Sequence, residues 1–453
     1  MSELLERVTR AIRRIDGVDD YVLVERAGER LESSRRHRER RLSERHVDVA
    51  LYRDGRGGRG VAQVRITAQE RDPQALLAQA AERAAHVQGP AWSAPPPAAP
   101  ARVTVSDIEL AADPGAALAS IPARLVFGAG PQLSLGQWRI AVERWQVEVR
   151  TSSLLASSFP STLIEVDAFL ADSRERIAVC ARKLDDLDWT DAVARAAARA
   201  DARARATALA PGRYDLVLSG EALIPDPGGA VAPERAAPWI SAPAAPGQAL
   251  AGHASFGWFG PLLAQSDARL VRQGLSRYGP GRSIYGAAHH SQSARGAPLT
   301  LTSDGTVPYG LRSRPFGDWG EPTRQLTLID GGVAVGLLCD LREAALRGVM
   351  PTGAPGNVVL PPGRTLPDTL RARVERPVVE AAALAWLAVE PRTGDFAAEL
   401  DLGYLDDGTA VTGGGFRGNV FAILAGARYS ARLTTRAWYR GPEAIRIDDV
   451  RMT

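Results

Sequence analysis

The first 90 residues place apolar side chains at helical spacing near both ends and at strand spacing between them. Apolar positions three and four apart over residues 4–15, followed by Gly17, predict a helix. Residues 21–25 read as a strand, and apolar and polar positions alternate over 47–51 and again over 62–66. The two alternating runs flank an Asp-Gly-Arg-Gly-Gly sequence, which is typical of a hairpin turn, so they are predicted to pair.

A second helix is predicted to begin at Asp72, a capping residue that is followed by Pro73 at the first helical position. Its leucine and alanine stripe continues to residue 84, and Gly89 and Pro90 end it. The resulting order is a helix, three or more strands and a helix. This order is typical of an open antiparallel sheet with helices on one face.

Residues 91–101 consist mainly of proline and alanine, which predicts a stiff, extended linker. Strand-like apolar runs then cover 138–150, 163–170 and 177–181, and the last two are expected to form a hairpin. An alanine- and arginine-rich helix is predicted over 189–209, on propensity alone. We interpret this helix as structural.

The rest of the chain alternates short apolar runs with turns that contain glycine and proline. An apolar strand is predicted at 214–218, and a hairpin at 326–337 around an Asp-Gly-Gly turn. We therefore divide the chain into an N-terminal domain at 1–210 and a C-terminal domain at 211–453. The predicted fold class is α+β, with an N-terminal antiparallel sheet and flanking helices followed by a β-rich C-terminal domain.

Composition and charge exclude several classes of function. A formal net charge of +3 over 453 residues is too small to predict binding to nucleic acid or to a membrane. The N-terminus lacks the apolar stretch of a signal peptide, and no window approaches the ~18 apolar residues of a membrane span. Cys180 and Cys339 lie in apolar runs, so we interpret them as reduced core thiols of a cytoplasmic protein.

Arginines gather between residues 35 and 45, with Glu39 and Glu44 interleaved. Because no aromatic residues are interleaved to stack on bases, we interpret this run as a solvated face of a strand or loop. A patch that contacts peptide or RNA is the alternative.

Residues 303–340 carry the most specific pattern in the chain. A Gly-Leu-x-Ser-x-Pro-Phe element at 310–316 precedes a Gly-x-Pro-Thr-Arg element at 320–324, and the predicted hairpin follows. This stretch resembles the signature region of the TldD/TldE (PmbA) family of two-component zinc metallopeptidases. The Pro-Arg-Thr-Gly-Asp-Phe sequence at 391–396 and the Gly-Asn pair at 418–419 resemble further elements of that family.

In the catalytic members of this family, a zinc-binding His-Glu-x-x-x-His helix follows the strand that opens the C-terminal domain. Such a helix holds zinc with two imidazoles on one face, and its Glu activates a bound water. The matching stretch here, residues 220–238, contains no histidine, and Pro225 and Pro227 argue against a regular helix across it. The late cysteine ligand of the catalytic members is also missing, because no cysteine follows Cys339. We therefore predict no catalytic residue, metal ligand or cofactor in this chain.

The resemblance implies a TldE-like, non-catalytic subunit of a heteromeric metallopeptidase that degrades or processes unfolded peptides. Leader peptides of ribosomally made natural products are one such substrate class. The implied partner is a TldD-like subunit that carries the zinc, and neither nucleic acid nor membrane is expected as a partner. The signature loop supplies five candidate residues for binding peptide or partner: Arg312, Arg314, Phe316, Trp319 and Arg324. The alternative for Phe316 and Trp319 is that they pack the core of the hairpin.

Two other functions stay open at this point. One is an active hydrolase with a rebuilt metal or serine site around His253, His289 and His290, with Asp267 or Asp304 as a further ligand. Adjacent histidines on a strand would point to opposite faces, so their spacing favours surface or loop residues. The other is a stand-alone peptide-binding or regulatory homodimer that needs no catalytic partner.

Overall fold

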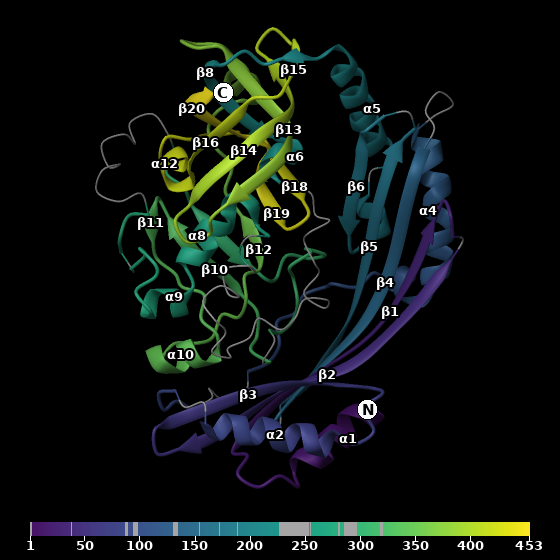
Figure 1. The fold of residues 1–453 in the computed structure, drawn as a ribbon, viewed down its shortest axis with the longest axis vertical. Coiled ribbons are helices and arrows are strands. Elements are labelled where there is room, and N and C mark those ends of the chain that lie inside the picture. The colour runs from purple at the N-terminus through teal and green to yellow at the C-terminus, as the bar shows by residue number, and fades with distance from the viewer. Residues whose placement is uncertain are drawn as a thin grey trace.

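The structure is a computed structural model of the chain, in which a long N-terminal sheet curves around a C-terminal body made of two further sheets (Figure 1). It describes residues 2–37, 39–86, 89–93, 98–129, 135–153, 155–171, 173–187, 189–225, 253, 255–279, 281–284, 297–317 and 320–453.

The N-terminal sheet has six antiparallel strands in the order β3-β2-β1-β4-β5-β6. Their bounds are β1 Asp20–Ser34, β2 Arg40–Gly55, β3 Gly58–Thr67, β4 Leu135–Thr151, β5 Ala156–Leu170 and β6 Arg176–Ala181. The predicted strands and both predicted hairpins are confirmed. β1 continues well beyond the predicted 21–25, because its charged residues find partners on neighbouring strands: Arg26 pairs with Asp48, and Arg30 pairs with Glu143.

All helices of this region cover one face of the sheet, as predicted. Helices α1 Glu3–Ile12 and α2 Pro73–His86 pack on Leu23 at one end of β1. Three more helices contribute to the apolar cluster around Leu31, at the other end of β1. They are α3 Ile108–Ala112, α4 Pro114–Ala129 and α5 Trp189–Arg205. Leu23 and Leu31 share a face because they are eight positions apart, an even spacing on a strand.

Three details of the helix predictions are corrected. The first helix ends at Ile12 and not at residue 15. The helix α5 ends at Arg205, and the next residues form strand β7, Thr207–Ala208, which pairs with β15 of the C-terminal body. Helices α3 and α4 were not predicted, because α3 has only five residues and α4 begins at Pro114 and contains Pro122.

The C-terminal body consists of two sheets around one large core. An eight-stranded sheet has the order β17-β20-β8-β13-β14-β15-β7, with β16 paired to β14, and a six-stranded sheet has the order β11-β10-β9-β12-β19-β18. The first contains β8 Gly212–Ser219, β13 Val378–Val389, β14 Asp395–Leu405, β15 Ala410–Thr412, β16 Gly415–Asn419, β17 Arg428–Tyr429 and β20 Ala444–Met452. The second contains β9 Leu301–Asp304, β10 Gln325–Asp330, β11 Val333–Ala334, β12 Asn357–Val359, β18 Leu433–Arg436 and β19 Tyr439–Pro442.

Short helices connect these strands, and a cluster of aromatic side chains fills the space between the sheets. The helices are α6 Gly220–Leu223, η3 Gly257–Phe259, α8 Gly260–Gln265, α9 Ala268–Arg272, α10 Leu341–Arg347, α11 Pro367–Arg371 and α12 Val420–Ala425. Phe259 stacks on Tyr439 at 5.3 Å between ring centroids, and Phe256 lies edge-on to Trp438 at 4.9 Å. The two sheets around this core confirm the predicted β-rich C-terminal region.

No helix within the described ranges is both long and apolar enough to cross a bilayer.

The predicted signature hairpin exists, but its second strand is shorter than expected. Gly331 and Gly332 turn the chain between β10 and β11 with φ values of 55° and 80°, which favour glycine. The N–H groups of Val335 and Gly336 both donate to the Leu328 carbonyl, at 2.9 and 3.2 Å. This bifurcated contact ends regular pairing at Ala334, so residues 335–337 leave the sheet.

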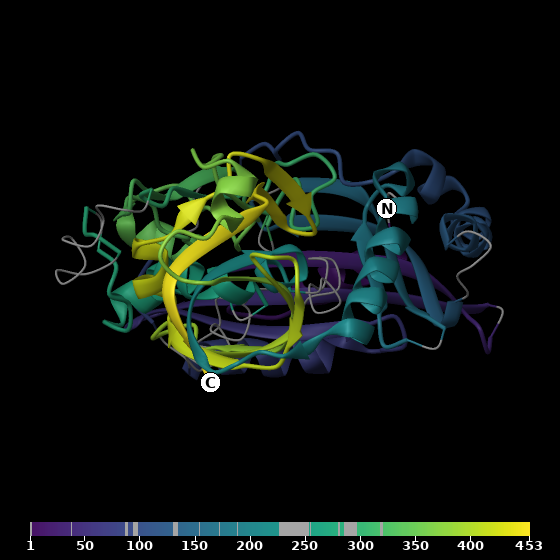
Figure 2. The same ribbon diagram turned by 90° about the horizontal axis from the view of Figure 1, so that it is seen from above.

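The C-terminal body docks on the face of the N-terminal sheet that the helices leave free. Phe159 of β5 and Val149 of β4 form one apolar cluster with Phe316 and Leu341 of the C-terminal body. Figure 2 shows the arrangement from above, with the yellow and green C-terminal strands on one side and the blue and teal N-terminal elements on the other. The predicted linker takes part in this seam, since the Ala101 N–H donates to the Pro315 carbonyl at 2.8 Å.

Candidate functional site

The position after β8 is where the family resemblance places a zinc helix in catalytic members. Here β8 runs into Gly220, which has a φ of 49°, and a four-residue helix, α6, follows. Its sequence is Gly-Glu-Ala-Leu, and the buried side chains of Ala222 and Leu223 anchor it to the core. Residues 226–252 lie outside the described residues, and the sequence contains no histidine between Ser219 and His253. The side chains at this position therefore do not fit a zinc site.

His253 is the one histidine of the predicted alternative site that the structure describes. It is buried, and its Nε2 lies 3.6 Å from Oδ2 of Asp267. The sequence analysis offered this pair as part of a rebuilt metal site. Within the described residues, no group of three His, Cys, Asp or Glu side chains is placed to hold a metal. His289 and His290 lie outside the described residues, and Asp304 instead accepts from the N–H and hydroxyl of Thr306 at 2.7 Å.

Asp267 belongs to an ionic network that holds helices α9 and α10 together. It caps α9 by accepting from the Arg269 N–H at 2.8 Å, and the Arg269 guanidinium lies 3.2 Å from its other oxygen. Burial alone would raise the pKa of Asp267, but the hydrogen bond from His253 and the charge of Arg269 outweigh it and lower the pKa to about 2. Arg269 also lies 3.8 Å from Asp340, which caps α10. The network therefore has the features of a structural anchor.

The thiol of Cys339, which lies beside this network, is expected to be unreactive. Cys339 is buried, and burial raises the pKa of its thiol to about 12. Because the thiolate is the nucleophilic form, such a thiol is unreactive near neutral pH. Cys339 lies in the core as predicted, whereas Cys180 is only half-buried.

The signature loop, residues 303–324, lies in the seam between the two parts of the molecule. Phe316 is 2% exposed, and its ring meets Phe159 of β5 edge-on at 5.0 Å between centroids. Leu311 packs on Leu163 of the same strand. Phe316 thus packs against the N-terminal sheet and not within its own hairpin.

Arg182, which follows β6, is the polar counterpart of these apolar contacts. It is fully buried, and its guanidinium donates to the carbonyls of Gly310 at 3.0 Å and Leu311 at 3.1 Å. It also donates to the hydroxyl of Ser161 on β5 at 2.5 Å. One guanidinium thus ties the N-terminal sheet to the backbone of the signature loop, and the sequence analysis missed it because an arginine after a strand carries no distinguishing pattern.

The remaining candidate residues of the loop are mostly engaged within the chain. Arg312 stacks over the Phe256 ring at 4.8 Å and donates to the Ser255 hydroxyl at 3.1 Å. Arg314 is buried, and its carbonyl accepts from the Thr323 hydroxyl. Arg324 is half-buried, and its carbonyl accepts from the Gly305 N–H at 3.2 Å. Trp319 lies outside the described residues. The binding roles of all five residues stay predictions.

A cleft of about 310 Å³ opens between the N-terminal sheet and the C-terminal body, next to this loop. Strand β6 forms one wall and the end of β18 forms the opposite wall, while α5, Glu221 of α6, and Tyr309 and Leu311 of the signature loop complete the lining. In Figure 1 the two strands lie on either side of the gap between the parts of the molecule. Among the strands that the structure describes, both are terminal in their sheets.

Glu221 bridges two arginines that meet at the end of this cleft. Its Oε1 lies 3.2 Å from Arg199 of α5 and 3.2 Å from Arg436 of β18. Arg199 and Arg203 also share Glu175, and Arg203 makes a two-pronged contact with Asp401 of β14 at 2.7 Å. Paired charges on both walls fix the position of α5 relative to the C-terminal body. The sequence analysis found none of these residues, because their partners are distant in the chain.

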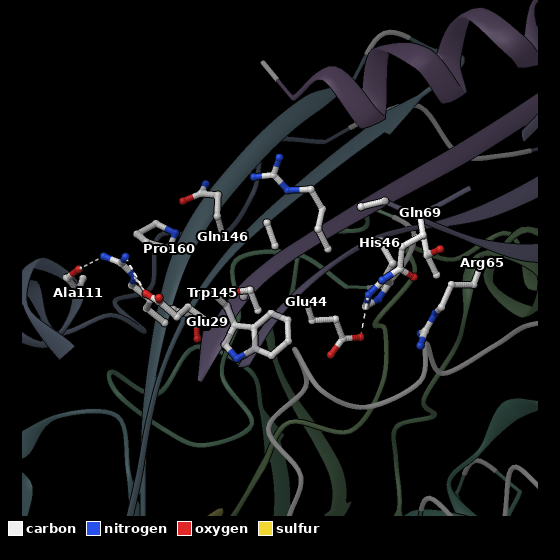
Figure 3. A pocket seen from close by; sticks show the side chains of 17 residues that line it. Glu29, Glu44, His46, Arg65, Gln69, Ala111, Trp145, Gln146 and Pro160 are labelled. Atoms are coloured by element: carbon white, nitrogen blue, oxygen red, sulfur yellow. Dashed lines mark hydrogen bonds and ion pairs between the residues drawn. The ribbon is translucent and has the colours of Figure 1, made fainter. Parts of the chain in front are cut away.

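A second, wider cleft of about 740 Å³ lies on the N-terminal sheet between the turn before α2 and helix α3 (Figure 3). Trp145 and Gln146, neighbours on β4, project to opposite sides of the strand there, as strand geometry requires. Polar side chains contact one another there: His46 Nδ1 lies 3.0 Å from Glu44, and Arg144 lies 2.7 Å from Glu29. The Arg run of the sequence contributes exposed residues such as Arg45 to this region, in agreement with a solvated strand face.

Comparison with known proteins supports the resemblance. Residues 259–453 match the family model described as the PmbA/TldA metallopeptidase C-terminal domain. No curated protein matches the chain.

Three solved structures share the fold over 99% of this chain. TldE from Thermococcus kodakarensis is 17% identical with a TM-score of 0.70, and the match covers 100% of its chain. Proteins described as modulators of DNA gyrase, from Bacteroides thetaiotaomicron and Thermotoga maritima, are each 15% identical, with TM-scores of 0.72 and 0.71 and coverage of 98% and 100% of their chains. At these identities the likeness shows a common fold.

Proposed function

We propose that this chain is a non-catalytic, TldE-like subunit of a two-component metallopeptidase. The premise is that the chain belongs, through its C-terminal domain, to the TldD/TldE (PmbA) family. Its partner would be a TldD-like subunit that carries the zinc. Its own role would be to form one wall of the enclosure that admits unfolded peptides, among them leader peptides of ribosomally made natural products.

The observation that carries this proposal is the chemistry of the segment after β8. A catalytic member needs two histidines on one helical face there, and α6 offers Gly220, Glu221, Ala222 and Leu223. The carboxylate of Glu221 is occupied by Arg199 and Arg436. A fold kept over almost the whole chain, together with a segment after β8 that lacks the histidines of the catalytic members, supports a subunit that assists catalysis.

The proposal predicts that cleavage of an unfolded peptide requires both subunits. The purified chain, a TldD-like protein encoded beside it and their mixture are compared on an unstructured fluorogenic peptide, with zinc measured in each sample. We expect activity and zinc to follow the partner, and activity to vanish when the Glu of the partner's His-Glu-x-x-x-His motif is changed to Gln. The opposite result would be about one zinc per chain in this protein together with cleavage by it alone.

Loss of that zinc on His253→Ala would identify a rebuilt hydrolase site, the first alternative from the sequence. Size measurements on the mixture address the second alternative. A permanent heterodimer should bury on the order of 2,000 Å² or more and stay together at micromolar concentration. A homodimer that ignores the partner would contradict the proposal.

A further inference from the structure

We propose that a cavity on the outer face of the eight-stranded sheet binds a free α-amino acid, a ligand that carries one ammonium and one carboxylate group. The cavity has a volume of about 300 Å³, lies beside β20 and is lined by other residues than the two clefts described above. Its lining consists of Asp215, Val374, Glu375, Arg376, Arg428, Arg446 and Asp448. The inference goes beyond the proposed function and does not depend on it.

Strand geometry places this cavity on the face of the sheet that points away from the aromatic core. Ile445 and Ile447 of β20 belong to that core, so the alternate residues Arg446 and Asp448 project from the opposite face. Arg428 of β17 pairs with Arg446 and therefore shares its face. Helix α11 covers another part of the same face. Figure 1 shows β8 and β20, the two central strands of this site, in the upper part of the C-terminal body.

Two charged side chains of the cavity are buried and held by other groups of the chain. Arg446 is 0% exposed and donates to Asp215 at 2.7 Å. Another of its nitrogens donates to the carbonyls of Leu370 and Ala372 at 2.8 and 2.7 Å. Asp215 also accepts from the N–H of Asp449, a non-glycine residue with a φ of 61°. Backbone strain of this kind persists only where surrounding contacts hold it in place, so the floor of the cavity is rigid before a ligand arrives.

The other lining residues have unused hydrogen-bonding groups of both signs. The Nε atom of Arg428 is buried and has no hydrogen-bond partner among the described residues. Two arginines contact Oδ1 of Asp448, which leaves its Oδ2 without a partner in the part of the chain that the structure describes. Arg376 contacts Asp449 through Nε at 3.2 Å and Glu375 through one terminal nitrogen at 3.9 Å, and its second terminal nitrogen has no partner there. Unused donors and an unused acceptor therefore line one cavity.

The balance of charge selects a ligand that carries both charges. The lining holds three guanidinium groups and three carboxylates. A small anion would be repelled by the carboxylates, and a metal cation by the guanidinium groups. An α-amino acid can instead offer its carboxylate to Arg428 and Arg376 and its ammonium group to Asp448. A volume of about 300 Å³ has room for such a ligand, and Val374 supplies an apolar contact for its side chain.

Titration calorimetry on the wild-type chain tests whether both charges of the ligand are needed. The probes are L-leucine, N-acetyl-L-leucine, which lacks the ammonium group, and L-leucinamide, which lacks the carboxylate. Loss of charge-assisted hydrogen bonds should weaken binding of either blocked probe about tenfold or more. Equal binding of the three probes would overturn the inference, and so would a failure of both L-leucine and glycine to bind at about 10 mM. Competition by inorganic phosphate at an affinity similar to that of L-leucine would identify an anion site and would also overturn it.

A matched set of variants places the site. Arg428→Gln keeps a hydrogen-bond donor but removes the charge, and should weaken L-leucine binding about tenfold or more. The control is Arg432→Gln, a change at an exposed arginine outside the lining, which should bind L-leucine as the wild type does. Melting temperatures without ligand show whether the variants fold. Unchanged affinity in a folded Arg428→Gln variant would overturn the inference.

Should Arg428→Gln fail to fold, Asp448→Asn makes the same comparison at the group that receives the ammonium. This substitution keeps the size of the side chain and removes its charge. We expect L-leucine binding about tenfold weaker or more, with little change in the affinity of N-acetyl-L-leucine, which has no ammonium group to lose. Equal weakening of both probes would show that Asp448 acts on the structure of the cavity alone, and unchanged L-leucine binding would overturn the site.

Discussion

The signature loop and the cavity beside β20 differ in the way they use arginine. In the loop, carbonyls of Gly310 and Leu311 accept from the buried Arg182, and Phe316 is packed against Phe159. In the cavity, the buried Nε of Arg428 has no hydrogen-bond partner among the described residues. The most recognisable sequence of the chain thus locks two parts of the molecule together, and inconspicuous strands form the open surface. The signature loop therefore marks the contact between the two parts of the molecule. The proposed place for a ligand is the cavity beside β20.

Phe316→Ala should have the largest effect on stability. Truncation of a buried aromatic side chain leaves a cavity in the seam and should cost about 3–5 kcal/mol. Urea unfolding measures the loss. Arg324→Ala, in the same loop but half-buried, serves as the control and should change stability by less than about 0.5 kcal/mol. A stable Phe316→Ala variant that loses peptide turnover would show that the loop is a binding surface. That result would contradict the contrast between a structural loop and an open cavity.

Arg182→Ala tests the polar half of the seam. It leaves several buried carbonyls without their charged donor, which should cost about 3 kcal/mol. The matched control is Arg174→Ala in the exposed turn before β6. Thermal melts that show equal stability for the two variants would mean that the loop does not depend on Arg182 for its position.

Gly331→Val tests the hairpin that follows the loop. A Cβ at this position meets no atom within 4 Å, so the cost comes from the positive φ of 55° and should be about 1–3 kcal/mol. Gly331→Asn is the control, because asparagine tolerates this conformation better than valine does. Pull-down with the zinc-bearing partner should weaken for the valine variant. No difference between the variants would exclude backbone strain as the cause.

The pH dependence of stability should reveal the network around Asp267. Its pKa is about 2 in the folded chain, below the ordinary value of 3.8, so its contribution is present above about pH 4 and is lost as the pH falls toward 2. The contribution should be about 2 kcal/mol. Urea unfolding of the wild type and of Asp267→Asn should therefore differ most near neutral pH and converge on acidification. The exposed Asp368→Asn variant is the control, and a constant gap would contradict this assignment.

Arg203→Ala should have the smallest effect. Its contacts with Glu175 and Asp401 are partly exposed, so their loss should cost about 1 kcal/mol or less and less still at high salt. Thermal melts at low and high salt measure the effect. A loss of stability that high salt leaves unchanged would contradict this assignment.

The sequence predicted local structure well and distant contacts poorly. Strand periodicity and turn residues identified the N-terminal sheet, its hairpins and the β-rich C-terminal region, because these signals are local. The order of the sheets and the place of Phe316 on Phe159 depend on contacts between residues far apart in the chain. The bounds of helices α8 and α9 were not predicted, since residues 225–300 are rich in glycine, proline, alanine and serine and indicated only loops with short strands or helices.

The candidate site was harder to predict than the fold. Missing histidines after β8 could be read directly, and they remain the basis for expecting no metal ligand in this chain. The cleft between β6 and β18 depends on two sheet edges that face each other, and neither Ala178 nor Thr435 carries a chemical pattern that marks an edge. His253 and Asp267 do come together, as one alternative required, but Arg269 completes the pair and no third metal-binding side chain among the described residues joins it.

Hydrogen exchange on the wild-type chain, with and without L-leucine, tests the contrast between loop and cavity most directly. The account predicts that L-leucine slows exchange of the backbone amides of residues 374–376, which line the cavity, and leaves those of residues 303–317 unchanged, because they are already held in the seam. Protection that appears in the signature loop and is missing from residues 374–376 would contradict it.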